Sequence, residues 1–177
     1  MTATTFDIDP VNTFLAFAVP YLAISKVHGR FTRFGGVLEI DWDDLSRSTA
    51  HLRIDTGSIE TGHPERDAHL RSQDFLDVER FPEMLFHSTE VRRTRGALFD
   101  VAGTLYLHGV AKPVTLHAEY GGKASDHHGT ERVGVLATGI IDRRLFGLTW
   151  DHPLQDGGMF VGFDVNLDLS IQGVRTG

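Results

Sequence analysis

Apolar and polar residues alternate with a period of two along most of this chain. The clearest run lies near the C-terminus, where glycine, acidic and amide residues separate a set of apolar ones. That apolar set is Met159, Val161, Phe163, Val165, Leu167, Leu169 and Ile171. The same period recurs in runs that begin at Leu15, Ala50, Phe99, Val114 and Val133. Alternation of this kind predicts antiparallel strands with one buried and one solvated face.

Two segments depart from the alternation. Residues 64–77 begin with a proline, carry acidic residues in the first turn and pair Asp67 with Arg71 four positions later. This pattern predicts a helix. Residues 21–26 follow Pro20 and predict a short helical turn. With no layer of helices to cover the strands, the chain is all-β, as either a two-sheet sandwich or a closed barrel of about eight strands.

The predicted inner face mixes bulky residues with small ones, among them Gly103, Ala118, Ala137 and Gly139. A barrel of about eight strands is just wide enough to be filled by side chains or to hold one slim ligand. The pattern is therefore compatible with two interiors, one filled and one with a residual tunnel.

Composition narrows the choice of function. The 177 residues are 41% hydrophobic, which suits one domain spanning residues 1–177 with a substantial core. The net charge of −7 argues against nucleic acid as a partner. Cysteine is absent, so disulfides, thiolate metal sites and cysteine nucleophiles are excluded.

The N-terminal sequence predicts a cytoplasmic location. It has neither the basic start nor the apolar segment of a secretory signal peptide. The longest apolar stretch, Phe14 to Val19, is much shorter than the roughly 20 residues that span a bilayer. We therefore expect a soluble protein with no integral membrane segment.

One tetrapeptide suggests an enzyme. Asp55-Thr56-Gly57-Ser58 follows an apolar strand, as the catalytic tetrapeptide does in aspartic proteases. That chemistry needs two carboxylates sharing one proton, and this chain has a single copy, so catalysis by Asp55 would require a dimer. The ten histidines are scattered, and phosphate-binding or dinucleotide motifs are absent, so we predict neither a metal site nor a cofactor.

The segment from Ser58 to Asp77 is densely polar. It fits a solvated surface helix held by its own ion pairs. It also fits a lid over one mouth of a barrel, presenting Arg66, His69 or Arg71 to an anionic head group.

The same segment carries a recognisable signature. The block Arg66-Asp67-Ala68-His69-Leu70-Arg71-Ser72, with Ser58–Gly62 before it and Asp74-Phe75-Leu76 after it, resembles the YceI-like family of bacterial polyisoprenoid-binding proteins. Further matching motifs occur in order along nearly the whole chain: Phe6–Pro10, Val27–Phe31, Phe81-Pro82, Gly103–Leu105, Gly109–Val114, Ile141–Arg143, Phe146–Leu148 and Val161–Val165.

This resemblance implies an extended eight-stranded antiparallel lipocalin-like barrel with one short helix near one end. It implies binding, storage or transport of a polyisoprenoid, isoprenoid quinone or fatty-amide-like chain in an apolar tunnel, without catalysis, and a possible homodimer. Periplasmic relatives are expected, because many members carry export signals. The sequence departs from the family pattern at Phe163, where an acid is usual. If this position lines the tunnel, a phenyl ring there would narrow the tunnel or make its wall more apolar.

The alternation and the resemblance together predict the site residues. The expected tunnel lining is Phe17, Leu52, Ile54, Phe75, Val101, Leu105, Leu116, Val135, Phe146, Val161 and Phe163. The expected head-group residues at the mouth are Arg66, His69 and Arg143. Two alternatives remain: the Asp55 protease, and a filled barrel acting as a stress-related interaction module.

Overall fold

The structure, a computed structural model, describes residues 3–152, 154–155 and 160–176. Strands dominate these residues, and a single α-helix, α1 (Pro64–Arg71), lies among them. The strands are β1 (Thr4–Ile8), β2 (Phe14–Tyr21), β3 (Ser25–Phe31), β4 (Phe34–Ile40), β5 (Thr49–Asp55), β6 (Ile59–Glu60), β7 (Glu83–Arg95), β8 (Leu98–Leu107), β9 (Val110–Ser125), β10 (Glu131–Asp142) and β11 (Asp164–Arg175).

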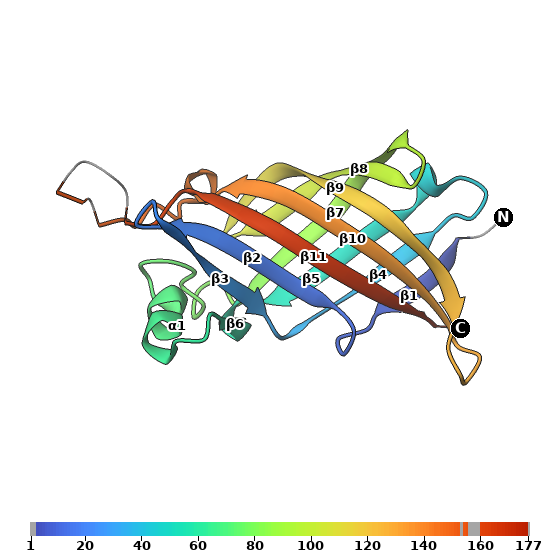
Figure 1. Cartoon of the computed structure of the whole chain (residues 1–177), viewed down its shortest axis with the longest axis horizontal. Coiled ribbons are helices and arrows are strands. Elements are labelled where there is room, and N and C mark those ends of the chain that lie inside the picture. Colours follow the sequence, from blue (N-terminus) through green and yellow to red (C-terminus); the bar gives the residue numbers. More distant parts are fainter. Residues whose placement is uncertain (1–2, 153, 156–159, 177) are drawn as a thin grey trace.

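These strands close into an extended antiparallel barrel (Figure 1). Strand β11 pairs with β10 on one side and, on the other, with both β1 and β2. Strands β1 and β2 therefore act as two halves of one long strand, and β3 and β4 repeat this arrangement beside them. Counted in this way the barrel has eight strands, with β6 added at the edge of β3. The structure thus confirms a barrel rather than a sandwich.

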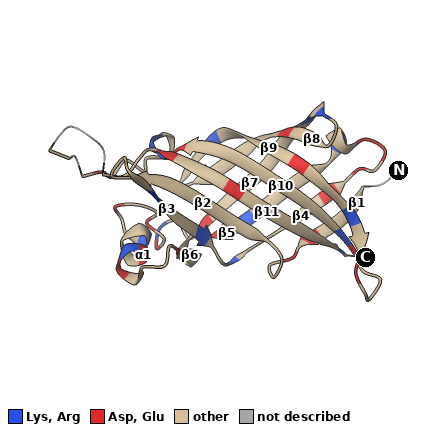
Figure 2. Ribbon diagram, in the orientation of Figure 1, with Lys and Arg blue, Asp and Glu red and all other residues tan. Residues whose placement is uncertain are grey.

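In the barrel, the alternating apolar side chains form the inner face of the wall, and the polar ones form the outer face. On β5, Leu52 and Ile54 point inward and are buried, whereas His51 and Arg53 point outward. Charged residues of both signs are interspersed along the strands and on α1 (Figure 2). The side-chain period of two is thus satisfied by burying one face of each strand.

Small inner residues make room for aromatic rings rather than leaving empty space. A Cβ atom on Gly103 would lie 2.5 Å from the ring of Phe86, and one on Gly29 would lie 2.4 Å from the ring of Phe17. Both rings therefore lie flat against a glycine, which fills part of the interior at close-packed density.

Two local predictions were wrong. Residues 21–26 are not a helical turn but the tip of the β2–β3 hairpin, where Leu22 and Ala23 have φ of 54° and 59°. Cross-strand pairing of Tyr21 with Ser25 overrides the local preference. The helix ends at Arg71, six residues before the predicted end, because the Ser72 hydroxyl and amide both donate to the His69 carbonyl. Met159, predicted to begin the last strand run, lies outside the described residues.

One end of the barrel is closed by side chains. Phe6 is fully buried there, with the ring of Trp42 edge-on to it at 6.0 Å. Outside this plug, Arg132 donates to Asp9 at 2.7 Å and to Asp126 at 2.9 Å, joining the residue that follows β1 to the β9–β10 turn. The start of β1 and the end of β11 lie at this closed end (Figure 1).

The described part of the chain contains no helix with the length and apolar character needed to cross a membrane.

Candidate functional site: an apolar tunnel with a polar mouth

The end of the barrel opposite the termini contains a cavity of about 440 Å³. Its walls come from the inner faces of the strands, from α1 and from the segment that follows β10. Most of the lining is apolar, and the polar side chains come mainly from α1. The walls comprise Phe17, Val19, Tyr21, Val27, Phe31, Ile59, His63, Glu65, Arg66, His69, Leu70, Phe75, Leu76, Met84, Leu107, Ile141, Arg143, Leu148, Trp150, Phe160, Val161, Val165 and Leu167.

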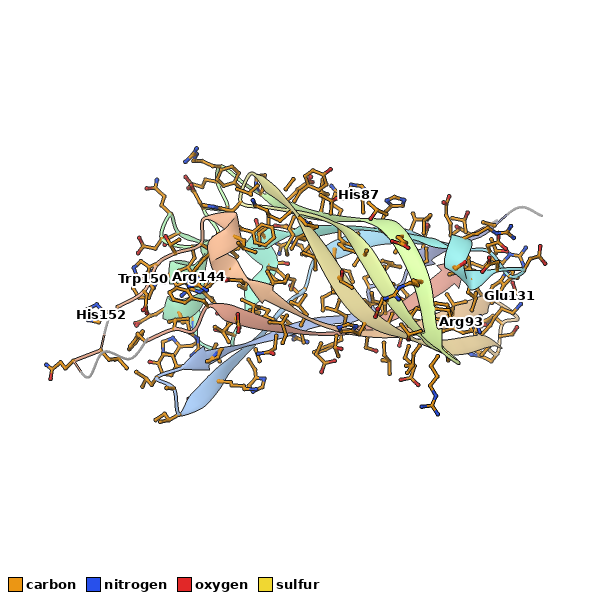
Figure 3. The ribbon with its side chains drawn as sticks, turned by 90° about the horizontal axis from the view of Figure 1, so that it is seen from above. His87, Arg93, Glu131, Arg144, Trp150 and His152 are labelled. Atoms are coloured by element: carbon orange, nitrogen blue, oxygen red, sulfur yellow. The ribbon has the colours of Figure 1, made fainter. Side chains whose placement is uncertain are left out.

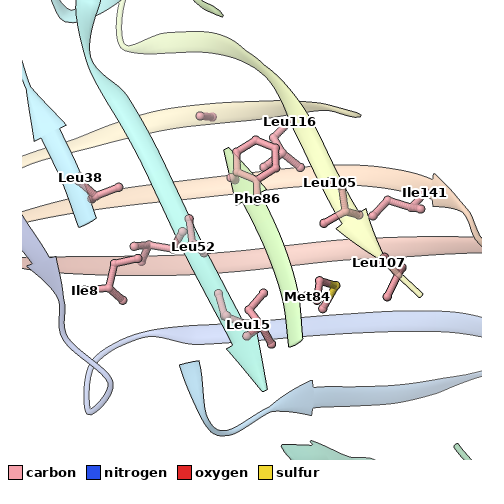
Figure 4. Close-up of a cluster of buried hydrophobic side chains, with 14 of the residues drawn as sticks. Ile8, Leu15, Leu38, Leu52, Met84, Phe86, Leu105, Leu107, Leu116 and Ile141 are labelled. Atoms are coloured by element: carbon pink, nitrogen blue, oxygen red, sulfur yellow. The ribbon is translucent and has the colours of Figure 1, made fainter. Parts of the chain in front are cut away.

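A second cavity of about 130 Å³ lies deeper in the barrel and has only apolar residues in its walls. Several of its wall residues point toward one another in Figure 4. The walls comprise Leu15, Ala16, Phe17, Phe31, Leu38, Ala50, Leu52, Ile54, Met84, Phe86, Val101, Leu105, Val114, Leu116, Ala118, Val135, Ala137, Ile141, Leu167, Leu169 and Ile171. We call these two spaces the outer and the inner chamber.

Most of the residues predicted to line the tunnel lie in these walls. The structure places Phe75 and Val161 on the outer chamber and Phe17 on both. The remaining members of this group lie on the inner chamber: Leu52, Ile54, Val101, Leu105, Leu116 and Val135.

Two predicted lining residues lie outside both chambers. Phe146 is 1% exposed and packs in the core, with its carbonyl oxygen 3.0 Å from Nδ1 of His108. The ring of Phe163 lies under the guanidinium groups of Arg143 and Arg144, at 4.7 and 4.4 Å. Because β11 begins only at Asp164, the strand alternation does not extend to Phe163. The structure thus places Phe163 outside the walls of both chambers, so the condition for a narrowing by this ring is not met.

Arg143 lies in the wall of the outer chamber and is only 4% exposed. Its Nε donates to the Gly162 carbonyl at 2.9 Å, Nη1 to Leu148 at 2.7 Å and Nη2 to Val161 at 3.0 Å. Burial lowers the pKa of this guanidinium, which still carries its charge at neutral pH. Arg143 thus ties the segment after β10 to the rim of the barrel. Nη1 and Nη2 each carry a second N–H, which can donate a further hydrogen bond.

Arg66 and His69 lie on α1, and both contribute to the wall of the outer chamber. Arg66 donates from Nε to the hydroxyl of Thr61 at 2.7 Å and from Nη2 to its carbonyl at 2.8 Å. Buried Asp67 accepts from the Thr61 amide at 2.9 Å. His69 has its Nε2 2.8 Å from a carboxylate oxygen of Asp74. The bonds to Thr61 fix α1 to the chain that follows β6. The three predicted head-group residues all lie in the wall of the outer chamber.

Aromatic residues around the mouth were missed by the sequence reasoning. Trp150 packs edge-on against His69 with ring centroids 4.8 Å apart, and Phe160 packs in the same way against Tyr21 at 5.0 Å. Figure 3 shows Trp150 and Arg144 at one end of the barrel and Glu131 at the other. Trp150 and Phe160 lie in segments without alternation, so period-two reasoning could not place them.

Asp55 is engaged in local structure. It accepts from the Gly57 amide at 2.9 Å, capping the short 3₁₀ turn Thr56–Ser58, and pairs with Arg33 at 2.8 Å. The hydrogen bond from Arg33 holds the pKa of this carboxyl below its usual value. Among the described residues, no three His, Asp or Glu side chains gather closely enough to hold a metal ion.

Comparison with known proteins agrees with this architecture, since the YceI-like domain family matches residues 6–173. The chain belongs to the YceI-like family. It is 39% identical over 165 residues to a UPF0312 protein of Serratia proteamaculans, covering 93% of this chain and 82% of that protein. It is 36% identical over 170 residues to Protein YceI of Salmonella newport, covering 96% and 85%.

Solved structures share the YceI-like barrel. The Campylobacter jejuni YCEI protein superposes with a TM-score of 0.74 at 26% identity, covering 89% of this chain and 90% of that one. BcnA of Burkholderia cenocepacia gives a TM-score of 0.80 at 17% identity, covering 93% and 98%. A domain from Saccharophagus degradans described as polyisoprenoid-binding gives 0.70 at 18% identity, covering 98% and 99%. The last two show the fold alone.

Proposed function

We propose that this YceI-like protein binds a long apolar isoprenoid or related lipid in its tunnel and stores or transports it without chemical change. The observation that carries the proposal is the pair of apolar chambers in series inside one closed barrel. A chain that leaves water for such walls gains about 25 cal/mol per Å² of apolar surface buried. The candidates are polyisoprenoids, isoprenoid quinones and fatty-amide-like chains. The description of the Saccharophagus degradans domain as polyisoprenoid-binding supports the isoprenoids.

The two ends of the tunnel predict the orientation of the ligand. The inner chamber has only apolar walls, and Phe6 plugs the barrel beyond it. The outer chamber has Arg66, His69 and Arg143 in its wall. The tail of the lipid therefore lies inside and its polar head at the mouth, where these side chains donate hydrogen bonds to head-group oxygens. Phe17 and the other wall residues make the contacts to the tail.

Native mass spectrometry of protein purified from its own host tests the main claim. We expect a bound mass that organic extraction releases as a prenyl or acyl lipid. The same spectrum counts the subunits and so tests the proposed homodimer. Fractionation of host cells tests the proposed cytoplasmic location. Repeated absence of any lipid, with no uptake of added prenyl alcohols or quinone, would refute lipid binding.

The two tryptophans provide a test of orientation. Trp150 lies at the mouth and Trp42 at the plugged end, so a ubiquinone head at the mouth will quench Trp150 more strongly. Titrating ubiquinone into Trp42→Phe, which keeps Trp150, should give strong quenching. The matched variant Trp150→Phe should give weak quenching. The reverse result would place the head at the plugged end and overturn the orientation.

A further inference from the structure

The outer and inner chambers meet at a ring of five shared wall residues. Each comes from a different strand, and the five strands lie around the circumference of the barrel. The ring consists of Phe17 on β2, Phe31 on β3, Met84 on β7, Ile141 on β10 and Leu167 on β11. We call this ring the waist. Figure 4 labels Met84 and Ile141, which project into the barrel from their strands.

Two aromatic rings form one side of the waist. The centroids of Phe17 and Phe31 lie 5.7 Å apart, and the ring planes are tilted by 43°. Both residues are only partly buried, in agreement with their position on open space. The ring of Phe17 lies flat on Gly29, where any larger residue would collide with it. Gly29 on β3 has no side chain, and this leaves the space that the ring of Phe17 occupies.

We propose that the waist selects ligands by chain length and that the inner chamber binds only the ends of long chains. This inference rests on the proposed lipid binding and concerns the same tunnel. A short prenyl chain is housed in the outer chamber, with its polar end at Arg143, and leaves the waist untouched. A long chain must pass between Phe17, Phe31 and Met84 before its tail reaches the inner chamber. These side chains narrow the passage between the two chambers, so a long chain must displace them to enter the inner chamber.

Phe17→Leu is the direct test, because it removes the ring but keeps an apolar side chain. Phe99→Leu is the matched control, because Phe99 is also a strand phenylalanine of the barrel but lies in the walls of neither chamber. The probes are farnesol, geranylgeraniol and solanesol, which are prenyl alcohols of increasing length. They are offered as an equimolar mixture to lipid-free protein, and native mass spectrometry gives the ratio of bound masses.

We expect Phe17→Leu to raise the bound ratio of solanesol to farnesol by about tenfold, the scale on which apolar pockets discriminate chain size. The Phe99→Leu control should keep the wild-type ratio. Met84→Ala, which widens the waist from the opposite strand, should shift the ratio in the same direction and serves if Phe17→Leu does not fold. Ratios that stay at the wild-type value in the folded waist variants would overturn the waist but leave lipid binding intact. Failure of the wild type to bind any of the three alcohols, by contrast, counts against the proposed function itself.

Discussion

Replacing Arg143 by Met would test how the mouth of the tunnel is held together. Methionine keeps an unbranched stem like that of arginine. It removes the guanidinium, which donates to the Gly162, Leu148 and Val161 carbonyls. Trp150 lies two residues after Leu148, and Phe160 lies just before Val161. The attachment of Leu148 and Val161 therefore decides whether these two rings stay in the wall of the outer chamber.

The magnitude follows from the three hydrogen bonds. A bond from a charged donor contributes about 1.5–3 kcal/mol, and a carbonyl left buried without a partner costs about 1–3 kcal/mol. The three bonds belong to one side chain and water can reach the mouth, so their effects do not add fully. We expect the free energy of unfolding to fall by about 3–5 kcal/mol. For a chain of this size that lowers the Tm by about 10 °C.

Arg144→Met is the matched control in the adjacent position. Arg144 is half-exposed and pairs with Asp142 at 2.8 Å, and such surface pairs contribute less than about 1 kcal/mol. Urea unfolding of lipid-free protein measures both variants without a ligand contribution. Amide hydrogen exchange should show faster exchange at Phe160 and Val161 in Arg143→Met alone. Equal stability of the two variants would refute the assigned role of Arg143.

Three further predictions concern the rest of the barrel. Phe6→Ala should lower the free energy of unfolding by about 3–5 kcal/mol in urea titrations, because the fully buried ring plugs the closed end, whereas half-exposed Phe14→Ala should cost less than about 1 kcal/mol. The pKa of Asp126 is about 2 in the fold, below the value of about 3.9 for an unfolded chain. Its stabilisation is therefore complete above about pH 4 and lost as the pH falls toward 2, so the stability difference between wild type and Asp126→Ala should shrink over that range. Asp55→Asn should keep the cap oxygen, cost less than about 1 kcal/mol through the lost Arg33 pair and leave lipid uptake unchanged; loss of uptake would contradict the capping role.

The tunnel walls were the part of the site most accessible to prediction. Leu52, Ile54, Leu105 and Leu116 sit in strand interiors, where a side-chain period of two leaves each residue only two directions. Phe163 broke this rule because it lies just before β11, outside the ladder that enforces the period. Errors therefore concentrated where strands end.

The mouth was much less predictable. Trp150 packs against His69, and Phe160 packs against Tyr21. Both aromatic residues lie outside the strands, and no sequence period encodes such contacts. Arg143 was expected at the mouth, but its bonds to three carbonyls depend on where those carbonyls arrive in space. Contacts between residues in irregular segments follow from packing of the whole chain.

What the sequence determined by itself was the alternation, and with it the strands, their buried faces and the all-β class, because strand geometry is local. Closure was decided only in three dimensions, by β11 at one end of the chain pairing with β1 and β2 at the other. The tertiary structure also decided how much of the enclosed space the side chains fill. Rings lying on Gly29 and Gly103 fill some of it and leave two chambers, a balance of volumes that depends on every inward side chain at once.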